Sequence, residues 1–403
     1  MTTAVCRACG RHLDAGFRFC DACAAPVAEQ PAARRGDSPL LPYRPELDGI
    51  RALAVLGVMF SHTAILLGIE NRARWLAAMA LGVDAFFVLS GYLITTLLLR
   101  EIRATDRVDL KAFYARRILR LIPALLLLIL IVGAISWTWE GFNSSGLPYA
   151  VLSALVLLYV GNWFIPFLGP NLLSHTWSLA LEEQYYIIWP SVLVHGLRRG
   201  KSWRFLAWSC VGAAVFVVVL RFVADPFVPV GEGPDRLSIS FTWTVMRADG
   251  VLIGSALGLA LDAGSDRLLK ILRRPITPLV GAGLVVAGLC AFHFWSGIFS
   301  SIPRVVCFAV AGVSLFLGHV VAQPKSPVNT ILRDRVLVGI GRISYGLYLF
   351  HVPVFALFAS DGITSLGELV VMFGVAFALA GLSFVVVERP ALRLKARFRP
   401  RAA

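Results

Sequence analysis

Long apolar runs alternate with short polar segments along the whole chain. Three of the clearest runs are Leu121 to Ile135, Phe205 to Val223 and Leu366 to Val387. Helical runs of this kind cross the roughly 30 Å hydrocarbon core of a bilayer, whereas strands of a membrane barrel alternate apolar and polar residues. These runs do not alternate, so the pattern predicts an all-α, polytopic bundle of membrane helices.

Basic residues between the runs predict how the chain crosses the membrane. They concentrate in the N-terminal region, in the tail after Glu388, and in the segments 100–120, 198–204, 267–274 and 325–342. Cytoplasmic loops carry such an excess of Lys and Arg, so both termini are expected in the cytosol. The expected spans lie near 50–68, 78–99, 121–139, 205–224, 241–262, 277–296, 303–322, 337–358 and 366–387.

The stretch from Tyr149 to Leu197 does not fit a simple pair of crossings. It contains two apolar stretches but must cross only once to leave the basic segment 198–204 inside. One stretch is therefore expected to be partial or re-entrant, which gives about ten spans in all plus this segment. Irregular backbone at membrane depth is tolerated where it lines a cavity, so this region is a candidate active-site wall.

Composition agrees with this picture and limits the partners. Hydrophobic residues make up 58% of the chain, charged residues 15%, and the mean hydropathy is +0.75, well outside the soluble range. The net charge of +14 sits in short loops, so it indicates topology and contact with membrane lipids, and no nucleic acid partner is expected. No cleavable signal peptide is expected at the polar N-terminus.

Two C-x-x-C motifs predict a small zinc ribbon at residues 1–26. Its four thiolates would hold a tetrahedral, structural Zn²⁺ and come from Cys6, Cys9, Cys20 and Cys23. So short a segment cannot form a hydrophobic core, so metal binding would supply its folding free energy. Disulfides are the alternative, which a reducing cytosol disfavours. The module is expected to dock, regulate or recruit, for example by binding a cytosolic protein.

The remaining sequence divides into three parts. Residues 27–42 form a flexible linker, 43–390 a membrane domain and 391–403 a basic cytoplasmic tail. The segment Glu388 to Pro390 is expected only to end the last helix.

Titratable groups inside apolar spans are costly and need a partner or a function. Arg51 opens the first span, and His62 follows eleven residues later. Eleven residues at about 100° each return to one helix face about 16 Å further along the axis. An imidazole there can take a proton from a hydroxyl, and an arginine near the cytosolic end can hold a phosphate. An interhelical hydrogen bond is the alternative role for His62.

Four further strings complete an ordered set. They are GVDAFFVLSGYLIT at 82–95, FYARRILRLIP at 113–123, HTWSLALEEQYY at 175–186 and ISYGLYLFH at 343–351. With the first span, their order resembles acyltransferase family 3, membrane proteins that O-acylate polysaccharides, lipopolysaccharide, peptidoglycan and some macrolides. Five ordered signatures, spread from about residue 43 to 390, are far more specific than any one of them.

The resemblance implies a catalytic group and a donor site. The matching catalytic residues are His62, Arg51 and Glu182, and the matching donor-binding cluster is Arg116, Arg117 and Arg120. It implies a cytosolic acyl-CoA donor, acetyl-CoA first, whose phosphates suit bidentate guanidinium groups. His62 would act as general base on the acceptor hydroxyl or carry the acyl group itself, and we favour the base. For each arginine, positive-inside topology alone is the alternative.

Candidate substrate-binding residues are Asp84, Glu183, Tyr345 and His351. Either Glu183 or its neighbour Glu182 is expected to orient an imidazole or bind sugar hydroxyls, with a structural ion pair to an arginine as the alternative.

Three other polar residues in the spans are expected to be structural. Ser90 is expected to mediate helix packing, with lining of the cavity as the alternative. Arg247 and Asp249 are expected to pair with each other.

These features together predict transfer of an acyl group from acyl-CoA to a hydroxyl of a glycan or a small-molecule acceptor. A transporter of an acylated or lipid-linked compound would also need intramembrane charges, but not a basic inner rim. A zinc-ribbon membrane sensor would be indifferent to His62. Many relatives append an extracytoplasmic hydrolase-like domain, and this chain stops at Ala403, so acceptor selection is expected in the membrane domain or in a separate protein.

Overall fold

The computed structural model describes residues 4–5, 12–13, 43–69, 72–138, 146–168, 171–224, 239–294, 298–359 and 365–398. Two short strands, β1 (Ala4–Val5) and β2 (His12–Leu13), form an antiparallel pair. The linker and the four cysteines of the predicted zinc ribbon lie outside the described residues: Cys6, Cys9, Cys20 and Cys23. The zinc ribbon therefore stays a prediction.

Six helical segments of the described chain are long and apolar enough to cross a membrane. They are α1 (Pro45–Leu66), the run α2 (Arg74–Ala77), η1 (Ala78–Leu81) and α3 (Gly82–Thr105), then α4 (Leu110–Thr138), α8 (Trp203–Ala224), α14 (Ile298–Ala322) and the run that begins with α18 (Leu366–Ser383). Trp208 and Phe216 of α8 are 70% and 65% exposed, as expected of a face that contacts lipid. The chain is a multi-pass membrane protein.

Two further candidate spans contain sharp bends. α12 (Asp266–Leu272) meets α13 (Thr277–Phe294) at 74°, and α16 (Arg335–Arg342), which follows α15 (Pro327–Leu332), meets α17 (Ser344–Ala359) at 69°. With each bent pair counted as one span, the described residues hold up to eight. The sequence predicted about ten spans, and this number stays a prediction.

The region expected to be irregular is broken into short pieces. α5 (Tyr149–Leu157) has 9 residues, so its length is about 14 Å, half of the hydrocarbon core. It is followed by α6 (Gly161–Phe164), η2 (Ile165–Phe167) and η3 (Ser174–Thr176), and then by the 22-residue α7 (Trp177–Arg198). α5 is too short to cross the hydrocarbon core and α7 is long enough, which agrees with one partial and one full crossing in this region. The span expected at 241–262 is also broken, into α9 (Ile239–Thr242), α10 (Thr244–Arg247) and α11 (Asp249–Asp262).

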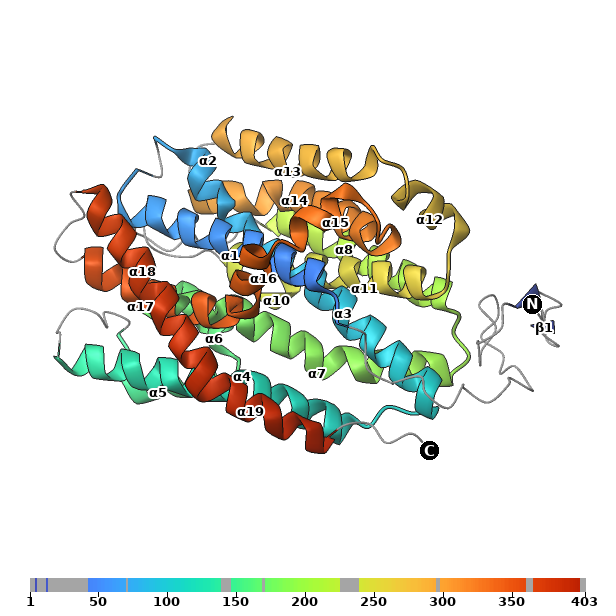
Figure 1. Cartoon of the computed structure of the whole chain (residues 1–403), viewed down its shortest axis with the longest axis horizontal. Helices are drawn as coiled ribbons and strands as arrows, with labels where there is room; N and C mark the ends of the chain where they lie inside the picture. The colour runs from blue at the N-terminus through green and yellow to red at the C-terminus, as the bar shows by residue number, and fades with distance from the viewer. Residues whose placement is uncertain are drawn as a thin grey trace.

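Figure 1 shows α13 and α14 at one edge of the bundle and α4, α5 and α19 at the opposite edge, with α3, α7 and α11 between them. Two glycines let α3 and α11 approach closely at the centre. A Cβ atom on Gly91 would lie 2.0 Å from the carbonyl oxygen of Val251, and one on Gly254 would lie 2.0 Å from that of Val88. Small residues allow this kind of backbone contact between membrane helices.

Buried ion pairs connect the helices around this centre. Arg221 pairs with Asp249 at 2.9 Å, and Arg247 pairs with Asp84 at 3.1 Å. The expected pairing of Arg247 with Asp249 is therefore wrong, because each has a partner on a more distant segment. The Arg247 guanidinium also lies 5.4 Å from the ring centroid of Phe241. These pairs keep four charges neutralised inside the bundle.

The last helix does not end at Glu388 to Pro390 as expected. α18 continues through a π-helical turn, η5 (Phe384–Glu388), into α19 (Arg389–Leu394) and η6 (Lys395–Phe398). Pro390 lies in the first turn of α19, where its missing N–H is tolerated. The segment 389–398 therefore packs along α4.

Candidate active site

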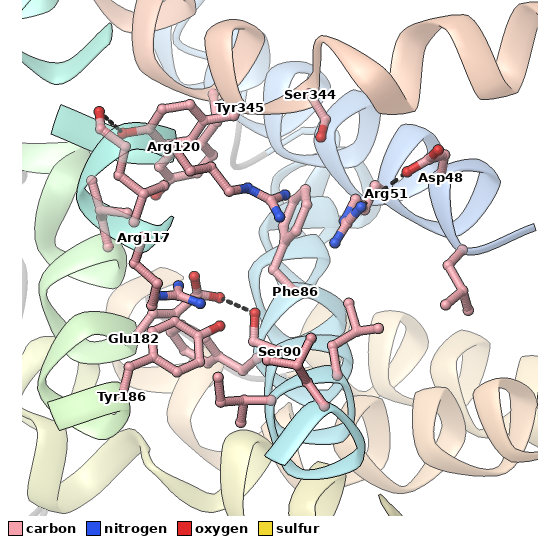
Figure 2. A pocket seen from close by; sticks show the side chains of 18 of the residues that line it. Asp48, Arg51, Phe86, Ser90, Arg117, Arg120, Glu182, Tyr186, Ser344 and Tyr345 are labelled. Carbon is pink, nitrogen blue, oxygen red and sulfur yellow. Dashed lines mark hydrogen bonds and ion pairs between the residues drawn. The ribbon is translucent and has the colours of Figure 1, made fainter. Parts of the chain in front are cut away.

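A cavity of about 490 Å³ lies between α1, α3, α4, α7, α17 and the C-terminal segment. Its wall combines cationic, carboxylate, hydroxyl and aromatic side chains (Figure 2). Six residues that the sequence predicted as site residues meet here: Arg51, Arg116, Arg117, Arg120, Glu182 and Tyr345. They come from four helices that are far apart in the sequence.

Two of the arginines direct their charge into the cavity. Figure 2 shows the guanidinium groups of Arg51 and Arg120 pointing toward the same space, with Phe86 and Ser344 beside them. Arg51 Nη1 lies 2.9 Å from Asp48 Oδ1. Arg120 has no hydrogen-bond or ion-pair partner among the residues that the structure describes. An uncompensated guanidinium in a cavity is suited to an anionic ligand.

The other two arginines of α4 are already neutralised. Arg116 lies 3.2 Å from Glu101, and both side chains are at most 5% exposed. Arg117 lies 2.8 Å from Glu183 and stacks on a ring of α7, with 3.4 Å between its guanidinium carbon and the ring centroid of Tyr186. Glu183 thus forms the structural ion pair that was the alternative for this residue.

Glu182 has a different environment from its neighbour. Its Oε1 accepts a hydrogen bond of 2.9 Å from Ser90 Oγ, and both residues line the cavity. Ser90 therefore lines the cavity and contacts a candidate catalytic residue, although helix packing was the role favoured for it. The remaining lone pairs of the Glu182 carboxylate can accept hydrogen bonds from a ligand.

Three hydroxyl side chains of α7 and α17 line one wall of the cavity: Ser178, Tyr345 and Tyr348. The Tyr345 hydroxyl donates to the Leu121 carbonyl at 2.9 Å. The Tyr348 hydroxyl donates to the His175 carbonyl at 2.7 Å and lies 2.6 Å from Ser178 Oγ. Since the Tyr348 proton goes to the carbonyl, Ser178 is the donor to the Tyr348 oxygen.

A pair of histidines lies behind this wall. His62 is partly exposed and His351 is fully buried, with 3.2 Å between His62 Nδ1 and His351 Nε2 and 4.9 Å between the ring centroids. Neither is among the lining residues, but the rings of His351 and Tyr348 are 5.8 Å apart. The structure therefore brings His62 and His351 together, one layer of side chains beyond the cavity.

Hydrogen bonds to the backbone fix the proton positions on both rings. His62 Nδ1 lies 3.0 Å from the Val58 carbonyl, and His351 Nδ1 lies 3.0 Å from the Leu347 carbonyl. A carbonyl only accepts, so both Nδ1 atoms carry hydrogen. The single proton on His62 Nδ1 is then shared between the Val58 carbonyl and His351 Nε2, and the lone pair of His62 remains on Nε2. No hydrogen bond to this atom is seen among the described residues, so it can take a proton.

His175 is the third imidazole of this cluster. Its ring centroid lies 5.6 Å from that of His351, and its Nε2 lies 3.0 Å from the Leu349 carbonyl. Nevertheless, within the described parts of the chain, His, Cys, Asp and Glu do not form a group of three or more that could hold a metal ion.

Several outcomes differ from what the sequence suggested. Asp84 does not line the cavity, because it is engaged in the ion pair with Arg247. Ser178 and Tyr348 were not singled out, although they lie inside the strings at 175–186 and 343–351. Lys395 also lines the cavity, and no local signal in the basic tail distinguishes it from its neighbours.

Comparison with known proteins gives the class to which this fold and site belong. A family model described as an acyltransferase domain (Acyl_transf_3) matches residues 44–388. The chain belongs to this acyltransferase family, as its ordered signatures had indicated.

Individual relatives narrow the comparison. The peptidoglycan O-acetyltransferase OatA of Listeria monocytogenes is 30% identical over 363 residues, which are 86% of this chain and 56% of that protein. The O-acetyltransferase OatA of Staphylococcus aureus (strain NCTC 8325 / PS 47) is 29% identical over 332 residues, 77% of this chain and 50% of that protein. The chain thus spans about half the length of the relatives it matches. No solved structure matches it.

Proposed function

We propose that this chain is an integral membrane O-acetyltransferase that moves an acetyl group from cytosolic acetyl-CoA to a hydroxyl of a glycan. The observation that carries the proposal is the cavity into which Arg51 and Arg120 both point, close to two paired histidines. Arg51 pairs with Asp48, whereas the described residues supply no partner for Arg120. Family membership supports acyl transfer. The names of the relatives support O-acetylation of a cell-envelope glycan such as peptidoglycan.

The donor would be held by its phosphates. Arg120 and Arg51 bind phosphate oxygens, while Arg116 and Arg117, neutralised by Glu101 and Glu183, hold the shape of the cavity wall. Glu182 accepts hydrogen bonds from substrate hydroxyl or amide groups in the cavity. In this proposal Asp84 and Glu183 support the site through their ion pairs and do not bind substrate directly.

His62 would act as the general base. Its Nε2 takes the proton of the acceptor hydroxyl as the oxygen attacks the thioester carbonyl carbon. The new C–O ester bond forms, the C–S bond breaks, and the leaving thiolate receives the proton from His62. His351 fixes the His62 tautomer through the 3.2 Å contact. Because Tyr348 and Ser178 separate the cavity from these rings, their hydrogen bond would have to open for the thioester to pass.

The remaining features fit a cytosolic donor. We propose about ten spans with both termini in the cytosol, so that the arginine-lined cavity opens to the cytosolic side. We also propose that Cys6, Cys9, Cys20 and Cys23 hold one structural Zn²⁺ and that this module binds a cytosolic protein. The β1–β2 pair flanks the first C-x-x-C in the sequence, which supports a ribbon. Metal analysis of the purified chain, with one zinc expected per chain, tests this.

Thiol release by purified protein tests the function. Acetyl-CoA is supplied with and without peptidoglycan fragments, and free thiol is measured together with labelled acetyl on the glycan. Thiol release that depends on the glycan and equals the acetyl gained is expected. A transporter would accumulate a labelled acylated compound in sealed vesicles without releasing thiol. The absence of thiol release with every glycan offered would overturn the proposal.

A further inference from the structure

The segment that follows the matched domain contributes a side chain to the cavity. The family match ends at residue 388, and Lys395 lies seven residues further on, at the start of η6. Lys395 nevertheless lines the same cavity as Arg51 and Arg120. Within the described part of the chain it has no hydrogen-bond or ion-pair partner.

A second contact holds this segment in place. Arg116 Nη1 donates to the carbonyl oxygen of Phe398 at 2.6 Å, while Arg116 Nη2 keeps its ion pair with Glu101. One buried guanidinium therefore joins α3, α4 and η6. Because the π-helical turn and α19 carry the chain back along α4, the position of Lys395 is set at both ends of the short segment.

We propose that this segment completes the donor site and that the Lys395 ammonium binds a phosphate of the thioester donor beside Arg120. The proposal rests on the proposed function, since it assumes a donor that carries phosphate. Six cationic side chains line this cavity: Arg44, Arg51, Arg116, Arg117, Arg120 and Lys395. Each of the first four has a carboxylate partner, whereas the described residues supply none for Arg120 or Lys395. A phosphate bound among them would relieve their mutual repulsion, which is a reason for the cluster to be retained.

Lys395 also gives the site a pH dependence. Burial, together with the guanidinium groups around it, lowers the pKa of Lys395 to about 8. The cations that lower this pKa are Arg120, Arg116, Arg117 and Arg51. The other charged side chains of the cavity wall are Arg44, Asp48 and Glu182, and Glu46, Glu101 and Glu183 pair with its arginines. Since a lowered pKa removes the ammonium charge as pH rises through about 8, donor affinity is expected to fall between pH 7 and 9.

Binding of acetyl-CoA to the full chain in neutral detergent tests this. Lys395→Gln is expected to raise the Kd roughly ten- to a hundredfold at pH 7, the effect of losing one charge-assisted hydrogen bond. Lys395→Arg is expected to keep the affinity and to remove its loss between pH 7 and 9. Arg393→Gln is the matched control, because it removes the same charge from an exposed position on α19 and should leave the Kd unchanged.

The outcomes separate this proposal from the function on which it rests. If the wild type releases thiol and Lys395→Gln binds acetyl-CoA as tightly as the wild type, the role of Lys395 is wrong and the function stands. If the wild type neither binds acetyl-CoA nor releases thiol, the function itself fails. A phospholipid headgroup has the same phosphate chemistry, so phosphatidylglycerol is added in a separate arm. If Lys395→Gln weakened binding of this lipid but left the Kd for acetyl-CoA unchanged, the proposal would also be overturned.

Discussion

At the scale of single residues, four of the five arginines that line the cavity were predicted as site residues, and they differ in what they can still bind. Arg116 and Arg117 are neutralised by Glu101 and Glu183, Arg51 by Asp48 on its own helix, and Arg120 by no described residue. The family resemblance predicted the arginine cluster on α4, and all three of its members line the cavity. It did not distinguish its members, because the two glutamates come from α3 and α7 and their pairing depends on how the helices pack.

Arg120 and Arg116 therefore have different expected phenotypes. Arg120→Gln should raise the KM for acetyl-CoA roughly ten- to a hundredfold, because it removes a charge-assisted hydrogen bond, and should leave the melting temperature unchanged. Arg116→Gln leaves Glu101 buried without its cation, which costs about 3–5 kcal/mol, so this variant should melt at a lower temperature. Kinetics and thermal unfolding in detergent measure both. Equal destabilisation in the two variants would contradict the distinction.

At the scale of elements, the apolar runs predicted the long helices well but not their breaks. The run at 205–224 is one helix, α8, whereas 241–262 and 337–358 are interrupted. Hydropathy measures the apolar character of a stretch and does not predict bends. Bends depend on packing with other segments, such as the close contact of Gly341 on α16 with the Asp48 carbonyl on α1. The same holds for the last helix, where a π-helical turn carries the chain past Pro390.

Close packing of α3 on α11 gives a prediction at this scale. Gly91→Ala would place a methyl group 2.0 Å from the Val251 carbonyl oxygen. Because backbone must move to make room, the variant should lose about 1–3 kcal/mol of stability or more. Gly212→Ala is the matched control, since nothing lies within 4 Å of its Cβ position on α8. Thermal unfolding in detergent should show a lower melting temperature for Gly91→Ala alone, and an unchanged one would argue against the tight contact.

At the scale of the whole molecule, composition and ordered motifs predicted the membrane class and the family. The family match over residues 44–388 confirmed the family, and six helices of sufficient length support the membrane class. The placement of His62 one layer behind the cavity could not be predicted, because helix periodicity relates Arg51 to His62 along α1 but says nothing of Tyr348 on α17.

The proposed topology predicts which parts of the chain a protease reaches. Epitope tags at both termini should be digested in inside-out membrane vesicles and protected in sealed right-side-out vesicles, because basic segments face the cytosol. A protease site inserted at Pro148, which is exposed at the start of α5, should show the opposite pattern. Immunoblotting of the two vesicle preparations measures this. Digestion of one terminal tag from each side would refute an even number of crossings.

The central claim, that an imidazole next to a phosphate-binding cavity performs acyl transfer, is tested most directly by separating binding from transfer in His62→Ala. This variant should bind acetyl-CoA with the wild-type Kd but transfer acetyl to the glycan about 10²- to 10⁴-fold more slowly, the usual contribution of a general base. His195→Ala, which changes an exposed histidine near the end of α7, should transfer at the wild-type rate. Transfer by His62→Ala at the wild-type rate would contradict the account.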